Sequence, residues 1–138
     1  MDAKEYLSRA FVLNRRIRAK EKQLDALKDH VPYTTPMMGD VKVQAAGGGS
    51  TVEFAAIRMV SLSEEIKNDI AEMSEAMKEI AALIRRVEDT ESEVVLELRY
   101  LAFMSWDEII AELGYSPGHV FRLHRDGLRR VDSFLLNR

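Results

Sequence analysis

Cysteine is absent from this chain of 138 residues, so neither a disulfide scaffold nor a thiolate metal site is available to it. That absence is typical of proteins in a reducing compartment, and we expect a cytoplasmic location. Long apolar runs are also missing. Charged residues interrupt the N-terminal sequence throughout, so we predict no signal peptide, no membrane span and no membrane partner.

Catalytic and cofactor motifs are lacking as well. The run Gly47-Gly48-Gly49 is not followed by the Lys-Ser or Lys-Thr of a phosphate-binding loop. No serine stands in a nucleophile-elbow context. His30 and His119 are far apart in sequence and have no acidic pair at ligand spacing. The sequence therefore predicts a protein that is not an enzyme and that has no cofactor and no metal.

Net charge is small, at −3, but its distribution is uneven. Residues 51–113 contain 6 Lys and Arg against 15 Asp and Glu, whereas residues 116–138 contain 5 against 2. Residues 1–30 are also basic, with 8 against 5. A basic C-terminal segment on an acidic body suits an element that contacts DNA selectively.

Two long helices are predicted in the first two thirds of the chain. Residues 2–30 contain no Gly or Pro and follow a 3-4 apolar alternation that Lys20 alone interrupts: Tyr6, Ala10, Leu13, Ile17, Leu24, Leu27 and Val31. Residues 52–88 repeat the pattern over about four heptads: Met59, Ile66, Ile70, Met73, Met77, Ile80, Ile84 and Val87. The remaining faces of this second helix are acidic: Glu64, Glu65, Asp69, Glu72, Glu75 and Glu79.

Residues 32–51 change character, because they hold two of the three prolines and four of the seven glycines. Pro32 and Pro36 end the first helix, and the glycines predict a flexible connector. Two long apolar seams joined in this way favour an antiparallel helical hairpin over residues 1–88. They are equally compatible with part of an intermolecular bundle, and we expect a homo-oligomer formed through the long helices.

Three shorter helices are predicted within a separate domain, residues 89–138. The first runs from Thr90 to about Leu101, with Thr90 or Ser92 as its cap. Ser105 and Glu108 form a capping box that opens the second, which ends before Gly114. Ser116 and Pro117 then start the third, which continues to roughly Leu135. Two capped helices joined by a short turn with glycine predict a helix-turn-helix.

The third helix has a basic face. At roughly 100° per residue, its apolar residues share one side: Val120, Leu123, Val131 and Phe134, with Gly127. Three arginines lie opposite, as expected of a helix that enters the major groove. We expect DNA contacts from Ser116, Gly118, His119, Phe121, Arg122, Arg125 and Arg129. Arg129 and Arg130 are expected to reach phosphates. His124 lies about 40° from the apolar centre and is interpreted as a packed structural histidine.

The C-terminal sequence resembles region 4 of sigma-70-type factors, and more closely the small phage and prophage regulators of the ArpU and RinA type. The residues that match are Arg99-Tyr100-Leu101, Ser105-Trp106-Asp107-Glu108-Ile109, Leu113-Gly114-Tyr115-Ser116, His119-Val120 and Arg122-Leu123-His124. The likeness extends over about 42 residues of the chain. Gly127 departs from the pattern, since region 4 usually has Ala there; it costs a helix up to ~1 kcal/mol but permits a bend or close packing.

This resemblance implies control of phage or prophage operons by binding double-stranded DNA, with contact to RNA polymerase as a further expectation. Two other functions remain open. One is a protein-interaction adaptor that grips a polymerase subunit without contacting DNA. The other is a phage packaging role, in which the helix-turn-helix recognises DNA at a packaging start site.

Overall fold

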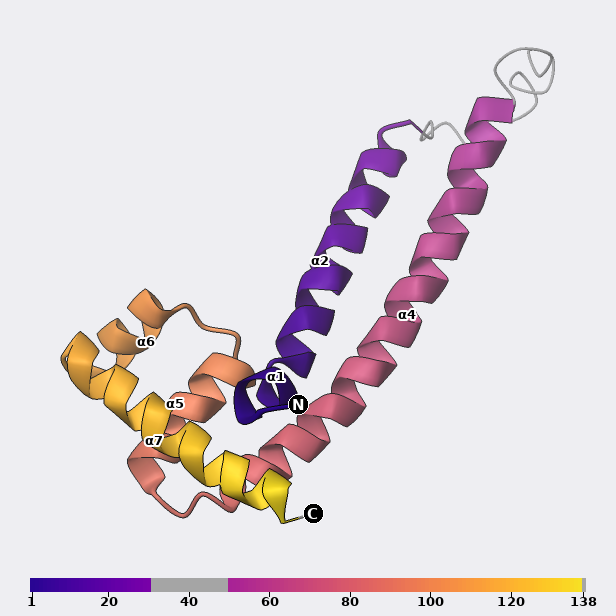
Figure 1. The fold of residues 1–138 in the computed structure, drawn as a ribbon. Helices are drawn as coiled ribbons and strands as arrows, with labels where there is room; N and C mark the ends of the chain where they lie inside the picture. Colours follow the sequence, from indigo (N-terminus) through magenta and orange to yellow (C-terminus); the bar gives the residue numbers. More distant parts are fainter. Residues whose placement is uncertain (31–49, 138) are drawn as a thin grey trace. The chain divides into compact units, whose positions relative to one another are not determined.

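The computed structural model describes residues 1–30 and 50–137, and the regular secondary structure of these ranges is all helical, which confirms the expected all-α class. The helices run in the order α1 (Ala3–Leu7), α2 (Arg9–Lys28), α4 (Ser50–Arg85), α5 (Thr90–Tyr100), α6 (Trp106–Leu113) and α7 (Pro117–Leu136) (Figure 1). Most of the predicted connector and the predicted seam residue Val31 lie outside the described residues. None of the described helices has the length and apolar character that a membrane crossing demands.

Two compact units divide the chain. The first consists of Met1–Asn14 with Glu72–Arg138, and the second is Arg15–Ala71. Both long helices, α2 and α4, run through the two units. The domain boundary expected between residues 88 and 89 lies inside the first unit and stays a prediction.

The first predicted helix is interrupted once, at Ser8, which separates α1 from α2. Asp2 caps α1 by accepting a hydrogen bond from the Glu5 amide at 2.8 Å. The amide of Ala3 donates to Asp132 Oδ1 at 2.7 Å, and this bond joins the start of the chain to α7. The short N-terminal helix is therefore anchored to the C-terminal part of the first unit.

The second unit is an antiparallel pair formed by α2 and α4. Ile17 and Leu62 are buried in its seam. Lys20, the one break in the predicted seam of α2, faces Asp69, with 2.6 Å between Lys20 Nζ and Asp69 Oδ2. This hydrogen bond raises the pKa of Lys20. The polar break is thus one half of an ion pair inside the seam.

The predicted seam of the second long helix is correct at seven of its eight positions and wrong at one. Met59, Ile66, Met73 and Met77 are partly buried, and Ile80, Ile84 and Val87 are fully buried. Ile70 is 47% exposed instead, and the neighbouring Asp69 is buried, so Asp69 does not belong to the exposed acidic face. Further buried residues lie beside the predicted seam: Ala55, Leu62, Ala76 and Leu83. Periodicity selected Ile70 because a charged residue occupies the seam next to an apolar residue that faces outward.

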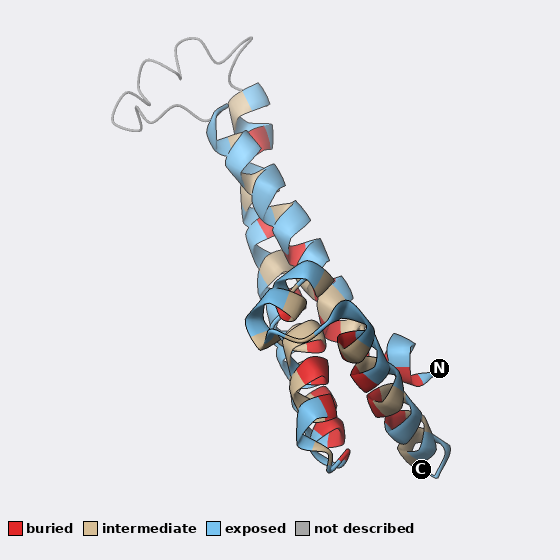
Figure 2. Cartoon of the chain, turned by 90° about the vertical axis from the view of Figure 1, so that its left-hand side faces the viewer, coloured by how far each residue is buried: buried red, intermediate tan, exposed pale blue. Residues whose placement is uncertain are grey.

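The first unit contains two apolar cores that share α5 and α7. Buried residues are red in Figure 2. The larger core joins α1, α2, α4 and these two helices, with Leu7, Ile84, Leu96 and Val131 among its fully buried members. The smaller is built on four buried residues of α5, α6 and α7: Val95, Ile109, Val120 and Leu123. Because α7 contributes to both cores, its rotation about its own axis is determined by packing.

Gly127 lies where α7 closely approaches α5. A Cβ atom added to it would lie 2.9 Å from Leu96 Cδ1 and 3.2 Å from Leu96 Cγ. Leu96 is completely buried and has little room to move. The glycine therefore permits close packing of the two helices, which explains the departure from the alanine expected in region 4.

Substitution Gly127→Ala is expected to lower the free energy of unfolding by about 1–2 kcal/mol, measured in urea. Overpacking against Leu96 typically costs about 1–3 kcal/mol and outweighs the gain in helix propensity of up to ~1 kcal/mol. Gly118→Ala is the matched control, because nothing lies within 4 Å of a Cβ added there. If both variants are equally stable, the close approach has no energetic consequence.

Candidate nucleic-acid interface

The helix-turn-helix predicted from capping signals is present. Ser105 Oγ accepts a hydrogen bond from the Glu108 amide at 3.2 Å, and the Ser105 amide donates back to Glu108 Oε1 at 2.9 Å. Gly114 ends α6 in the left-handed conformation, with φ 71°. Ser116 then caps α7, its Oγ accepting from the His119 amide at 3.2 Å, and Pro117 is the first helical residue. Each local signal thus has the structural role expected of it.

The helix before this pair begins differently from the prediction. Asp89 is the N-cap of α5, not Thr90 or Ser92, and its side chain makes no capping bond. Ser92 is completely buried instead. Glu91 and Glu93 do occupy the first turn, where negative charge complements the helix dipole.

The predicted arginines lie along the exposed face of α7. Arg122, Arg125 and Arg129 are all exposed, whereas Val120, Leu123 and Val131 on the opposite side are buried. The structure therefore brings these arginines together on one face, as the helical wheel predicted. Their guanidinium groups are suited to phosphate oxygens or to the edge of guanine.

The immediate surroundings of these arginines differ. Arg122 Nη2 lies 2.7 Å from His119 Nδ1, and His119 Nε2 lies 3.7 Å from Glu91 Oε2. Arg129 pairs with Asp126 at 3.5 Å. Arg125 makes no hydrogen bond or ion pair within the part of the chain that the structure describes. Of the three arginines, Arg125 would give up the fewest interactions within the chain when it binds a ligand.

The remaining predicted residues surround the start of α7. Ser116 and Gly118 are exposed, and no atom lies within 4 Å of a Cβ built on Gly118, so the backbone is open there. Phe121 is 42% exposed and packs edge-on against Trp106, with ring centroids 5.1 Å apart. One face of Phe121 is thus used in packing while the rest remains accessible.

Arg130, which is expected to reach phosphate, is exposed and already makes one hydrogen bond within the chain. Its Nη1 donates a 2.6 Å hydrogen bond to the carbonyl oxygen of Val87, just beyond the end of α4. That bond attaches α7 to the segment leading into α5. Arg130 is therefore engaged in holding the helices together.

His124 has the packed, hydrogen-bonded position that the sequence predicted. Its Nε2 lies 2.7 Å from the Tyr100 hydroxyl, and its ring contacts Trp106 with centroids 4.6 Å apart. Burial, with the positive charges of Lys4 and Arg99 nearby, lowers the pKa of His124 to about 4. Burial also raises the pKa of Tyr100 to about 12. Both groups are neutral at pH 7, so a neutral hydrogen bond joins the imidazole and the hydroxyl.

Because the pKa of His124 is lower in the folded chain than its usual value near 6.5, protonation favours the unfolded state. The stabilising effect of the neutral ring is fully present above about pH 6.5 and is lost as the pH falls towards about 4. We expect unfolding in urea to show a loss of roughly 1 kcal/mol between about pH 7 and pH 5, after allowance for partial exposure.

His124→Gln retains an acceptor but cannot titrate, so its stability is expected to change less over this interval. The difference in pH dependence between the parent protein and this variant separates the contribution of His124 from that of carboxylates, which titrate at lower pH. If the stability of both proteins depends on pH in the same way, the pKa of His124 is not lowered by folding.

The electrostatic character of the C-terminal helices is mixed. Residues 89–138 contain 9 acidic and 6 basic residues, and four of the six basic ones belong to α7. Positive charge in this part of the chain is therefore concentrated on α7. No group of three or more His, Cys, Asp or Glu residues is arranged to hold a metal ion within residues 1–30 and 50–137.

Comparison with known families gives one match. Residues 33–132, well over half of the chain, match the family described as a protein of unknown function, DUF1492. The chain belongs to the DUF1492 family. The matched range includes α4, α5, α6 and most of α7, so the candidate interface of this DUF1492 protein lies inside it. No match was found among curated proteins or among solved structures.

Proposed function

We propose that this DUF1492 protein binds double-stranded DNA through α7 and acts as a transcriptional regulator of the phage type. The proposal depends on one observation. Arg122, Arg125 and Arg129 follow one exposed face of a helix whose first turn is open and whose opposite face is buried. This is the arrangement by which a recognition helix approaches the major groove.

In the proposed complex, the N-terminal half of α7 enters the groove and α6 crosses the backbone beside it. Arg122 and Arg125 are the candidates for base contacts, because a guanidinium group forks onto guanine O6 and N7. Arg129 contacts phosphate. Ser116, Gly118, His119 and Phe121 surround the entry point. No catalytic step is proposed, and the protein acts where DNA is present, in the cytoplasm.

The resemblance to sigma-70 region 4 and to ArpU and RinA-type regulators supports this proposal. It rests on residues that the structure uses for capping and packing, among them Ser105, Glu108, Gly114 and Ser116. Those residues define a helix-turn-helix and do not themselves read bases. The proposed link to phage operons is therefore based on the resemblance, whereas the proposed DNA binding is based on the exposed face of α7.

Selection of duplexes from a random pool, followed by binding measurements at several salt concentrations, tests the proposal. We expect the affinity for DNA to fall as the salt concentration rises, because binding releases counterions from the DNA phosphates. Arg122→Ala with Arg125→Ala is expected to weaken binding to the selected duplex at least tenfold, because each base contact contributes about 1–3 kcal/mol.

Arg16→Ala with Arg18→Ala is the matched control, since both residues are exposed on α2 and the change in charge is the same. The control is expected to bind as the parent protein does. If both double variants lose the same amount of affinity, the loss reflects overall charge and not contacts made by α7. If the parent protein shows no salt-sensitive binding to DNA, the DNA hypothesis is wrong.

A second copy of the chain is the proposed partner of the second unit. The α2–α4 pair has a thin core, while Phe54, Ile57 and Val60 on α4 are 68%, 68% and 66% exposed. Ile57 and Val60 also line an apolar depression with Ala56 and Ser61. Two helices bury little apolar surface alone, and packing two such pairs into a four-helix bundle covers these side chains. A dimer also presents two α7 helices to paired half-sites.

Sedimentation equilibrium is expected to give a dimer for the parent protein and a monomer for Ile57→Glu with Val60→Glu. Each substitution forces a charge into the apolar contact. Leu136→Glu is the control, because Leu136 is 85% exposed on α7 and lies outside this surface. A parent protein that is monomeric at every concentration would contradict the second-copy proposal.

The excess of acid over base in residues 89–138 favours a second candidate function, that of an adaptor. In that case the helix-turn-helix grips RNA polymerase or a packaging protein without reading DNA. The duplex selection separates the two, since an adaptor yields no enriched sequence.

A further inference from the structure

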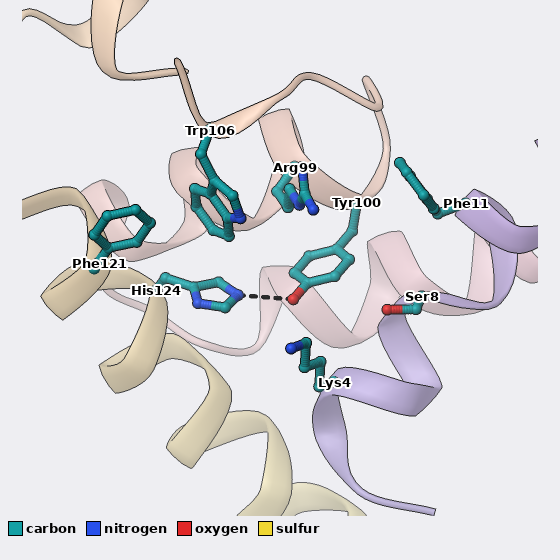
Figure 3. A pocket seen from close by; sticks show the side chains of 8 residues that line it. All are labelled: Lys4, Ser8, Phe11, Arg99, Tyr100, Trp106, Phe121 and His124. Atoms are coloured by element: carbon teal, nitrogen blue, oxygen red, sulfur yellow. Dashed lines mark hydrogen bonds between the residues drawn. The ribbon is translucent and has the colours of Figure 1, made fainter. Parts of the chain in front are cut away.

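A cavity of about 300 Å³ opens between α1, the start of α2 and the three C-terminal helices, all within the first unit (Figure 3). Its volume is at the lower end of the range for small-molecule sites. It lies on the side of α7 that holds Phe121 and His124, and none of the three predicted DNA-contacting arginines lines it.

The walls of this cavity are aromatic. Trp106 is in edge contact with Phe121 at 5.1 Å and with His124 at 4.6 Å between centroids. Tyr100 stacks on the other side of His124 at 5.7 Å, and Phe11 closes the far end (Figure 3). These rings present both faces and edges, which are the contacts that a further aromatic ring prefers.

Two cations also line the cavity, and no carboxylate does. Arg99 is held in position, because its Nη1 donates to the Met104 carbonyl at 3.0 Å and its guanidinium lies 4.7 Å above the Trp106 ring. Lys4 approaches from α1 and forms no ion pair with any described residue. Asp2, an acidic neighbour of Tyr100, is already occupied in the cap of α1.

The other polar groups of the lining are mainly donors. The Ser8 side chain points towards Tyr100, and the indole nitrogen of Trp106 faces the same space (Figure 3). His124 is neutral and is hydrogen-bonded to Tyr100, so it does not supply a third charge. A cavity with two cations, hydroxyl and indole donors, and aromatic walls is complementary to an anion attached to a ring.

We propose that this cavity is a binding site for a small aromatic carboxylate. The ring of the ligand packs against Trp106 and Phe121, and its carboxylate is held between Lys4 and Arg99. The cavity shares Phe121 with the proposed DNA interface but none of its three arginines, and the binding of a ligand is measured without DNA. It adds an effector site in which a bound ligand would contact both α1 and α7.

Trp106 is the only tryptophan of the chain and provides a direct probe of the cavity. Benzoate is expected to produce a saturable change in tryptophan fluorescence and a shift of the Trp106 indole N–H resonance. Cyclohexanecarboxylate, which lacks the aromatic ring, and benzyl alcohol, which lacks the charge, are expected to bind at least tenfold more weakly.

Lys4→Met is expected to raise the Kd for benzoate about tenfold, equivalent to one charge-assisted contact. Lys28→Met is the matched control, because Lys28 is an exposed lysine on α2 that pairs with Asp25, and it is expected to leave the Kd unchanged. Circular dichroism of each variant is the check that it is folded.

Three outcomes would overturn the proposal. The first is the absence of any saturable change with benzoate in the folded parent protein. The second is equal binding of benzyl alcohol, which would mean an apolar cavity without charge recognition. The third is an equal effect of Lys4→Met and Lys28→Met, which would mean nonspecific attraction. None of these outcomes depends on whether the protein binds DNA.

Discussion

The close approach of α7 to α5 at Gly127 is the constraint on which the candidate interface depends. Leu96 fills the space that a side chain on Gly127 would need. Leu96 and Val131 belong to the larger core, while Val95 and Leu123 belong to the smaller one. This close approach lets α5 and α7 contribute to both cores, and the packing of α7 in those cores determines which of its faces remains in solvent.

The capping residues and the arginines contribute to the interface in different ways. The capping box at Ser105, the left-handed Gly114 and the cap at Ser116 determine where α6 and α7 begin and end. Packing of Val120 and Leu123 then sets the rotation of α7, so its arginines face outward. Arg130 and His124 lie close to that face but are engaged in internal bonds. A side chain's partners, and not its charge alone, decide whether it is available to a ligand.

The helix-turn-helix could be predicted from the sequence because its determinants are local. Each cap involves residues three apart, and the exposed face of α7 follows from a single helical period. The predicted seam of α4 was wrong at Ile70, because periodicity selects that apolar residue and passes over the buried Asp69 beside it. The cavity could not be predicted at all, since Lys4 and Arg99 are brought together only by the packing of α1 on the C-terminal helices.

The ion pair of Lys20 and Asp69 has a consequence for how the two long helices recognise each other during folding. If α4 slid along α2 by one heptad in either direction, most apolar residues would still meet apolar residues. Lys20 would then face the level of Leu62, or Asp69 that of Leu27, and the 2.6 Å contact between the two charges would be lost. A hairpin in the wrong register is thus less stable than the native one, even though its seam contains nearly as many apolar contacts. The single polar layer sets the alignment of a repetitive sequence that would otherwise be ambiguous.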